Sequence, residues 1–167
     1  MNVRKKKIRM TAMAGVALLA ASCSIGGHHG NGDDNFFSAF TTFDDAQWIY
    51  ADGIEYVVDT LKNRSASGDF VLTLRHTPAY EYSNIWLEVD YNLDEGGACC
   101  DTFNIILADD YGRWRGKGTG ASFCISDTII RDVPLQQRQR IGLRHIMRTD
   151  TLHDIELIGL TYLPDNN

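Results

Sequence analysis

The sequence lacks the short motifs by which the common hydrolases are recognised. It contains no Gly-x-Ser-x-Gly nucleophile elbow, no His-Glu-x-x-His zinc pair and no Ser-x-x-Lys pair, each of which carries its own chemistry. Carboxylates are plentiful, and a glycosidase needs only two that are well placed, so a glycan hydrolase stays as a minor alternative. We predict no catalytic residue and do not expect an enzyme.

An excess of positive charge is also missing once the N-terminal leader is set aside. The first 22 residues hold five of the 16 Lys and Arg and none of the 22 Asp and Glu. The other 145 residues therefore hold 11 basic and 22 acidic residues, which gives a formal charge of −11. Nucleic-acid binders need a basic face to displace counterions. We therefore do not expect nucleic acid as a partner.

A long hydrophobic run is absent, and the short run that is present belongs to an export signal. Residues 10–21 are apolar but too few to span a bilayer as a stable helix. They follow a basic leader and close on Leu19-Ala20-Ala21-Ser22-Cys23. Small residues before a cysteine, behind a basic leader, are typical of a bacterial lipoprotein signal. We predict a signal peptide over residues 1–22 and lipid attachment at Cys23, with a plain secretory signal as the alternative.

Cysteine is scarce beyond Cys23, where only Cys99, Cys100 and Cys124 remain. A disulfide between Cys100 and Cys124, or between Cys99 and Cys124, suits an oxidising periplasm. Three small buried thiols without a bridge are the other interpretation. The vicinal pair lacks the spacing of a zinc knuckle and no histidine lies near it in sequence, so we predict no metal and no cofactor.

Residues 24–35 hold four glycines, and Ile25 is their one large apolar residue, which is the composition of a flexible tether. The lipidated cysteine and this tether occupy residues 23–35. A single globular domain is expected over residues 36–167.

Within that domain the apolar residues recur with a period of two, which is typical of half-buried strands. The alternating segments are 54–58, 70–74, 85–91, 103–107, 123–125, 141–147 and 160–162. His76 and His145 follow the inward alternation and are expected in the core or at its rim. The one helical hint is residues 151–154, where Thr151 would cap a single turn. At least seven strands without a long helix predict an all-β fold, an antiparallel β-sandwich of jelly-roll type.

A candidate binding face follows if segments 70–77 and 84–91 form a hairpin. Burying both apolar sets together then places Arg75 beside Trp86 on the outer side of the sheet, and Asn104 joins them by the same alternation. An aromatic ring flanked by polar groups is typical of a sugar-binding or partner-binding platform. The alternative is that Trp86 packs under a loop with Arg75 stacked on it.

The segment 111–120 is a second candidate, because Arg113, Arg115 and Lys117 surround Trp114. This is the densest positive charge in an acidic domain and suits an anionic partner. It is not a phosphate-binding P-loop, since no Ser or Thr follows Lys117. A strand connection with solvated charges is the alternative.

Several motifs, taken in order, carry a family resemblance. They are Leu74-Arg75-His76-Thr77, Tyr82-Ser83-Asn84-Ile85-Trp86-Leu87, Gly112-Arg113-Trp114, Gly116-Lys117-Gly118 and Met147-Arg148-Thr149-Asp150-Thr151-Leu152. Behind a lipoprotein signal, they resemble the GldH family of gliding-motility lipoproteins from Bacteroidetes over about residues 36–163. The resemblance implies a protein of the cell envelope, anchored by lipid to the outer membrane and facing the periplasm. It also implies work with other envelope lipoproteins in gliding and, through them, in type IX secretion, and no catalytic residues.

Two functions follow from these observations. The leading hypothesis is a non-enzymatic accessory or assembly component of the gliding and type IX secretion machinery. The alternative is a glycan- or peptidoglycan-binding lipoprotein that uses Arg75, Trp86 and Asn104. Arg75, Asn84, Arg113 and Asp150 also have a simpler interpretation, in which charge-assisted hydrogen bonds tie turns together.

Overall fold

The structure is a computed structural model that describes residues 37–58, 67–93, 97–134 and 139–165. The predicted signal peptide, Cys23 and the tether lie outside the described residues. Among the residues that the structure does describe, no helix is long and apolar enough to cross a membrane.

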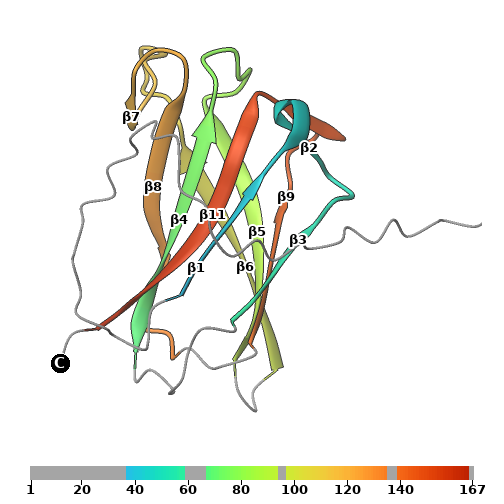
Figure 1. The fold of residues 1–167 in the computed structure, drawn as a ribbon, viewed down its shortest axis with the longest axis vertical. Coiled ribbons are helices and arrows are strands. Elements are labelled where there is room, and N and C mark those ends of the chain that lie inside the picture. Colours follow the sequence, from blue (N-terminus) through green and yellow to red (C-terminus); the bar gives the residue numbers. More distant parts are fainter. Residues whose placement is uncertain (1–36, 59–66, 94–96, 135–138, 166–167) are drawn as a thin grey trace, which may run out of the picture.

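Two antiparallel sheets pack face to face (Figure 1). The first has the order β1-β11-β4-β8-β7, with β1 Phe37–Thr42, β4 Gly68–His76, β7 Lys117–Gly118, β8 Phe123–Ile130 and β11 Ile155–Pro164. The second has the order β3-β9-β5-β6, with β3 Ile54–Val57, β5 Asn84–Leu93, β6 Gly97–Ile106 and β9 Arg140–His145. A small ribbon pairs β2 Gln47–Ile49 with β10 Thr151–His153, and η1 Asp44–Ala46 is a single 3₁₀ turn before β2.

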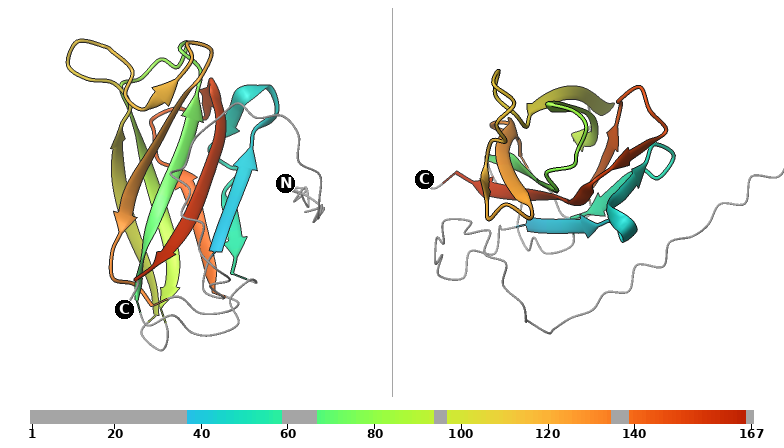
Figure 2. Two further views of the ribbon diagram at one scale, coloured as in Figure 1. Left: turned by 60° about the vertical axis from the view of Figure 1, so that its left-hand side comes forward. Right: turned by 90° about the horizontal axis from the view of Figure 1, so that it is seen from above.

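The connections make this sandwich a jelly roll. Apart from the β5–β6 hairpin, the successive long strands alternate between the two sheets, and Figure 2 shows the resulting closed outline from above. Strands that alternate in this way place their inner faces against each other. The predicted all-β, jelly-roll-like sandwich is therefore confirmed.

The alternating segments of the sequence coincide with real strands. Each of the seven predicted segments falls on β3, β4, β5, β6, β8, β9 or β11. The helical turn expected at 151–154 is wrong: Thr151–His153 is strand β10, with Leu152 opposite Trp48. Asp154 follows it with a left-handed φ of 66°, so this short polar residue makes the tight turn into β11 rather than the end of a helix.

The predicted hairpin between 70–77 and 84–91 is also wrong. Strand β4 pairs with β11 and β8, whereas β5 pairs with β6 and β9, so the two strands lie in different sheets. The segment 78–83 carries the chain from one sheet to the other. Two strands that face each other across a core bury the same alternate residues as two strands paired side by side, which is why the pattern alone does not separate the two arrangements.

The core lies between the inner faces of the two sheets. Leu72 and Leu74 from β4 meet Leu87 and Val89 from β5 in one hydrophobic cluster, and none of the four is more than 1% exposed. Trp48 of the β2–β10 ribbon belongs to the same cluster and is also buried. Its ring stacks on Phe43 with centroids 5.1 Å apart, and its indole N–H donates to the carbonyl of Asp52 at 3.2 Å.

Tyr56 ties one sheet to the other by a hydrogen bond. Its hydroxyl, on β3, lies 3.0 Å from Thr41 Oγ1 of β1 and 3.2 Å from the carbonyl oxygen of Ile158 on β11. Burial raises the pKa of Tyr56 to about 12, so the hydroxyl keeps its proton and remains a donor.

We expect Tyr56→Phe to lower the free energy of unfolding by about 1 kcal/mol, because the ring and its packing are kept and only the buried hydroxyl with its hydrogen bond is lost. Urea denaturation measures the change. The matched control is Tyr111→Phe, since Tyr111 is 85% exposed and should change stability by less than about 0.5 kcal/mol. Equal effects in the two variants would contradict the cross-sheet tie.

Candidate functional site

Trp86 and Asn104 lie side by side on the outer face of the sheet that contains β5 and β6. They are direct cross-strand partners, and the Trp86 side chain is 41% exposed. The neighbouring pair is Asn84 opposite Ile106, and the side-chain amide of Asn84 donates to Asn104 Oδ1 at 2.6 Å. The predicted association of Trp86 with Asn104 is therefore confirmed, and the Asn84 bond fixes how the Asn104 amide is turned.

Arg75 does not lie beside Trp86 as predicted. It stands on β4 in the other sheet, with Cys124 and Leu157 as cross-strand neighbours. Its Nε lies 2.9 Å from Glu156 Oε2, and both side chains are about one-third exposed. Arg75 thus holds a partner on its own sheet, at the irregularity that interrupts the β11 ladder between Ile155 and Leu157.

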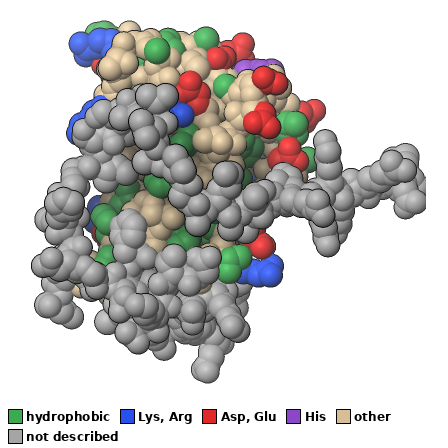
Figure 3. Space-filling model, viewed as in Figure 1, with side chains coloured by type: hydrophobic (Ala, Val, Ile, Leu, Met, Phe, Trp, Pro, Cys, Tyr) green, Lys and Arg blue, Asp and Glu red, His purple; other side chains and the backbone are tan. Residues whose placement is uncertain are grey.

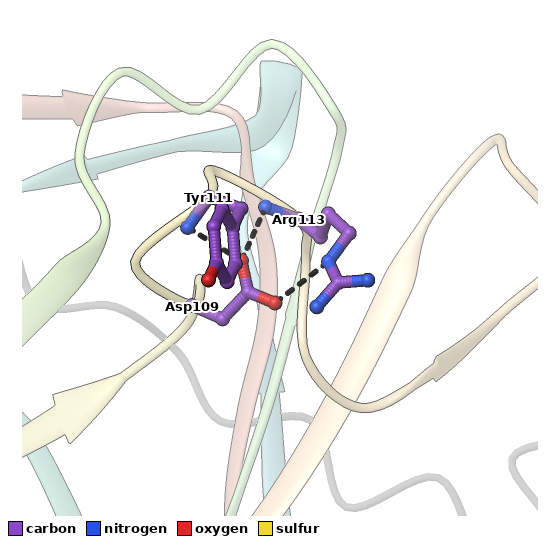
Figure 4. A network of polar contacts seen from close by, with 3 residues as sticks. All are labelled: Asp109, Tyr111 and Arg113. Atoms are coloured by element: carbon purple, nitrogen blue, oxygen red, sulfur yellow. Dashed lines mark hydrogen bonds and ion pairs between the residues drawn. The ribbon is translucent and has the colours of Figure 1, made fainter.

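Arg113 is part of a turn held by Asp109 (Figure 4). Asp109 Oδ1 accepts from the backbone N–H groups of Tyr111 and Arg113, at 3.0 and 2.9 Å, and Oδ2 accepts from Arg113 Nε at 2.8 Å. The Arg113 guanidinium also lies over the Tyr111 ring at 5.4 Å. The Arg113 backbone N–H is the largest cause of the lowered pKa of the Asp109 carboxyl. The aspartate therefore stays ionised and holds the turn, and the exposed Arg113 is already engaged by it.

Trp114 packs into an aromatic cluster at the end of the sandwich. Its ring centroid is 4.6 Å from that of His76 in an edge-on arrangement and 6.3 Å from that of Phe123. Tyr80 also contacts His76 at 5.7 Å. The predicted binding residue Trp114 is thus half-buried against core residues, and its contacts here position the loop.

Lys117 lines an open groove that no single stretch of sequence indicates. The groove has a volume of about 650 Å³ and is lined from both sheets. Asn104 and Ile106 come from β6, Thr73 comes from β4, and Ser126 and Asp127 come from β8. Lys117 is the first residue of β7, and Arg115 lies two residues before it. Two of the predicted site residues, Asn104 and Lys117, therefore meet in one groove. The local sequence pattern does not show the jelly-roll order, which places β6 at the edge of its sheet and β8 next to the short edge strand β7.

The cysteines form no disulfide among the described residues. Cys100 lies on β6 opposite Asp90, and Cys124 lies on β8 in the other sheet. The predicted bridge between Cys100 and Cys124 is absent from this structure. A hydrogen bond to Asp90 is the largest cause that raises the pKa of the Cys100 thiol, to about 11.

Glu88, Asp90 and Cys100 are the one cluster of metal-ligating side chains within the described residues. Glu88 is ion-paired with Arg144, and the Cys100 thiol keeps its proton at neutral pH. Metal binding needs thiolate and free carboxylate oxygens. This donor set is therefore a poor fit for a metal ion.

His76 and His145 are both completely buried, as predicted. His76 Nδ1 lies 2.8 Å from the carbonyl oxygen of Thr77, so Nδ1 carries the proton, and the buried Nε2 has no hydrogen-bond partner among the described residues. His145 lies edge-on to Trp48 and Tyr50, with centroids 5.2 and 5.6 Å away. Burial lowers the pKa of both histidines, although Glu156 and the Thr77 carbonyl oppose part of this for His76.

We expect stability to fall as the pH drops below about 6.5. Above that pH both histidines are neutral in the folded and unfolded chains; below it the unfolded chain takes up protons that the folded chain resists. The loss is at most about 1.4 kcal/mol per pH unit for each histidine, and it ends below the folded pKa. Urea denaturation at pH 7.5, 6.5 and 5.5 measures it. His76→Gln should flatten the profile and the exposed His153→Gln should not, whereas a flat profile of the unmodified protein would contradict the prediction.

The comparisons with known proteins give one family. A family model described as GldH lipoprotein matches residues 35–161, and no curated protein matches. Among solved structures, Eiger TNF from S. frugiperda is 11% identical over 79% of this chain and 95% of that chain, with a TM-score of 0.35. Xyl-CBM35, solved in complex with a glucuronic acid-containing disaccharide, is 20% identical over 83% and 86%, with a TM-score of 0.38.

Proposed function

The chain belongs to the GldH lipoprotein family, and on that basis we propose that it is a non-enzymatic accessory component of gliding motility and of the associated type IX secretion machinery. The family match over residues 35–161 carries the proposal, because it spans nearly the whole sandwich. A lipoprotein of this family is a lipid-anchored protein of the cell envelope. We place it on the outer membrane, facing the periplasm, with Cys23 as the lipidated residue.

One exposed surface supports a role in binding a protein partner. Tyr50 and Met147 line a shallow depression together with Asp150, and the backbone N–H of Trp86 donates to Met147 Sδ at 3.3 Å. Tyr50 is 45% exposed and Trp86 41%. Tyrosine, tryptophan and methionine are enriched in protein interfaces. We call Tyr50, Trp86 and Met147 the aromatic surface and assign the partner contact to it.

We expect Cys23→Ala to abolish lipid attachment, because the thiol of Cys23 is the proposed acceptor. Metabolic labelling with a radioactive fatty acid in the native host measures it, and the precursor should keep its signal peptide and so show a higher mass on gels. Cys100→Ala is the matched control and should be labelled like the unmodified protein. Labelling of the Cys23→Ala protein would overturn the assignment of the anchor.

We expect in-cell cross-linking of a C-terminally tagged copy to recover gliding lipoproteins or type IX secretion components, identified by mass spectrometry against an untagged strain. Added soluble glycan should not change the recovery, since the contact is between proteins. Tyr50→Ala combined with Trp86→Ala should reduce the recovery about tenfold or more, because buried aromatic residues dominate interface energies.

Tyr111→Ala is the control for that experiment, since Tyr111 is exposed but lies in the loop between β6 and β7. Deletion of the gene should also stop colony spreading and lower the secretion of type IX substrates. The proposed function would be contradicted if the deletion strain spread and secreted normally and cross-linking recovered no gliding lipoprotein or type IX secretion component.

A further inference from the structure

The groove between β4, β8 and β6 is a surface to which both sheets contribute. Figure 2 shows β6 and β8 along the same side of the sandwich, where each is at or next to the edge of its sheet. Residues of both strands therefore line one concave groove with a volume of about 650 Å³. Binding sites for small ligands commonly have volumes of about 300–1,000 Å³.

The two cationic side chains of this groove have no carboxylate partner among the described residues. Among the described residues, neither Arg115 nor Lys117 forms an ion pair. In contrast, five of the six other arginines that the structure describes are neutralised by a carboxylate: they are Arg75, Arg113, Arg131, Arg140 and Arg144. Figure 3 shows basic side chains at its upper left, where Figure 1 places β7, and acidic side chains mainly at the upper right. In a domain with a strongly negative formal charge, two free cations in a concave surface attract a ligand that carries carboxylates.

The other polar groups of the groove suit a ligand rich in hydroxyl groups. Asn104 Oδ1 is occupied by Asn84, which leaves the Asn104 NH₂ group as a donor toward the groove. Asp127 forms no ion pair with the described residues and offers carboxylate oxygens as acceptors. Thr73 Oγ1 and Ser126 Oγ bond to each other at 2.9 Å, so these hydroxyls are already ordered before a ligand arrives. Donors and acceptors in fixed positions match sugar hydroxyls, because each hydroxyl can both donate and accept a hydrogen bond.

Aliphatic contacts complete the surface, since Val71, Ile106 and Leu163 line the same groove. Such apolar groups pack against the C–H faces of sugar rings, whereas polar groups fix orientation.

We propose that this groove binds an acidic oligosaccharide, that is, a glycan segment with carboxylates on its sugar rings. Arg115 and Lys117 bind the carboxylates, and Asn104 and Asp127 bind the hydroxyls. The inference does not rest on the role in gliding. A direct binding measurement on the purified lipoprotein tests it, whereas recovery of partners from cells tests the motility proposal, so either can fail alone.

The test is calorimetric titration of the full-length lipoprotein in detergent with three probes of similar length. The probes are an oligogalacturonate, a neutral chito-oligosaccharide and an oligoglutamate peptide. We expect saturable binding of the oligogalacturonate and at least tenfold weaker binding of the other two. Arg115→Gln combined with Lys117→Gln should weaken oligogalacturonate binding about tenfold or more, because charge-assisted hydrogen bonds are the strong ones.

The matched control is Arg131→Gln combined with Arg140→Gln, which removes the same charge from exposed residues that do not line the groove. It should leave binding within about twofold, and Asn104→Ala should weaken binding with no change in thermal unfolding. Equal binding of the oligoglutamate would show an unspecific anion site and overturn the proposal. Absence of oligogalacturonate binding, or binding that both charge variants reduce equally, would overturn it as well.

Discussion

The packing of the two inner sheet faces against each other is the constraint on which the rest of this structure depends. Leu74 of β4 and Leu87 of β5 are both fully buried in one cluster, and each large side chain buried in this way contributes about 1.5–3 kcal/mol. Because successive long strands pack on opposite sides of this core, the chain crosses between the two sheets at almost every connection. The crossing leaves β6 and β8 on one side of the sandwich and so brings Asn104 and Lys117 to the same groove.

The sequence predicts which residues face inward far better than it predicts which strands are neighbours. Alternation with period two identifies the strands around Phe70, Ile85 and Ile141 and also places His76 and His145 inside. It does not distinguish a hairpin from a crossover, since both bury the same alternate residues. The short strands β2 and β10, of three residues each, escape notice because three residues are too few to show a period.

The candidate site also contains residues whose proximity the sequence predicts and residues whose proximity depends on the order of the strands. Trp86 and Asn104 are adjacent because both face outward on strands that do pair as neighbours. Arg75 would join them only if β4 and β5 formed a hairpin, whereas it lies on the other sheet beside Glu156. The groove residues come from β4, β6, β8 and the connection after β6, so their meeting follows from sheet order. Local pattern carries no information about that order when every strand has the same period.

Two of the motifs that carry the family resemblance, residues 112–114 and 116–118, shape the connection between β6 and β8. Asp109 holds Arg113 by three hydrogen bonds, and Trp114 packs on His76. Gly116 has a φ of 88°, and a Cβ there would collide with the carbonyl of Cys124. These residues are framework, and they leave little freedom in the backbone on either side of Arg115. A loop whose backbone is already ordered loses little backbone entropy when a ligand binds, so the framework residues of the motif contribute to the groove by fixing the backbone positions of Arg115 and Lys117.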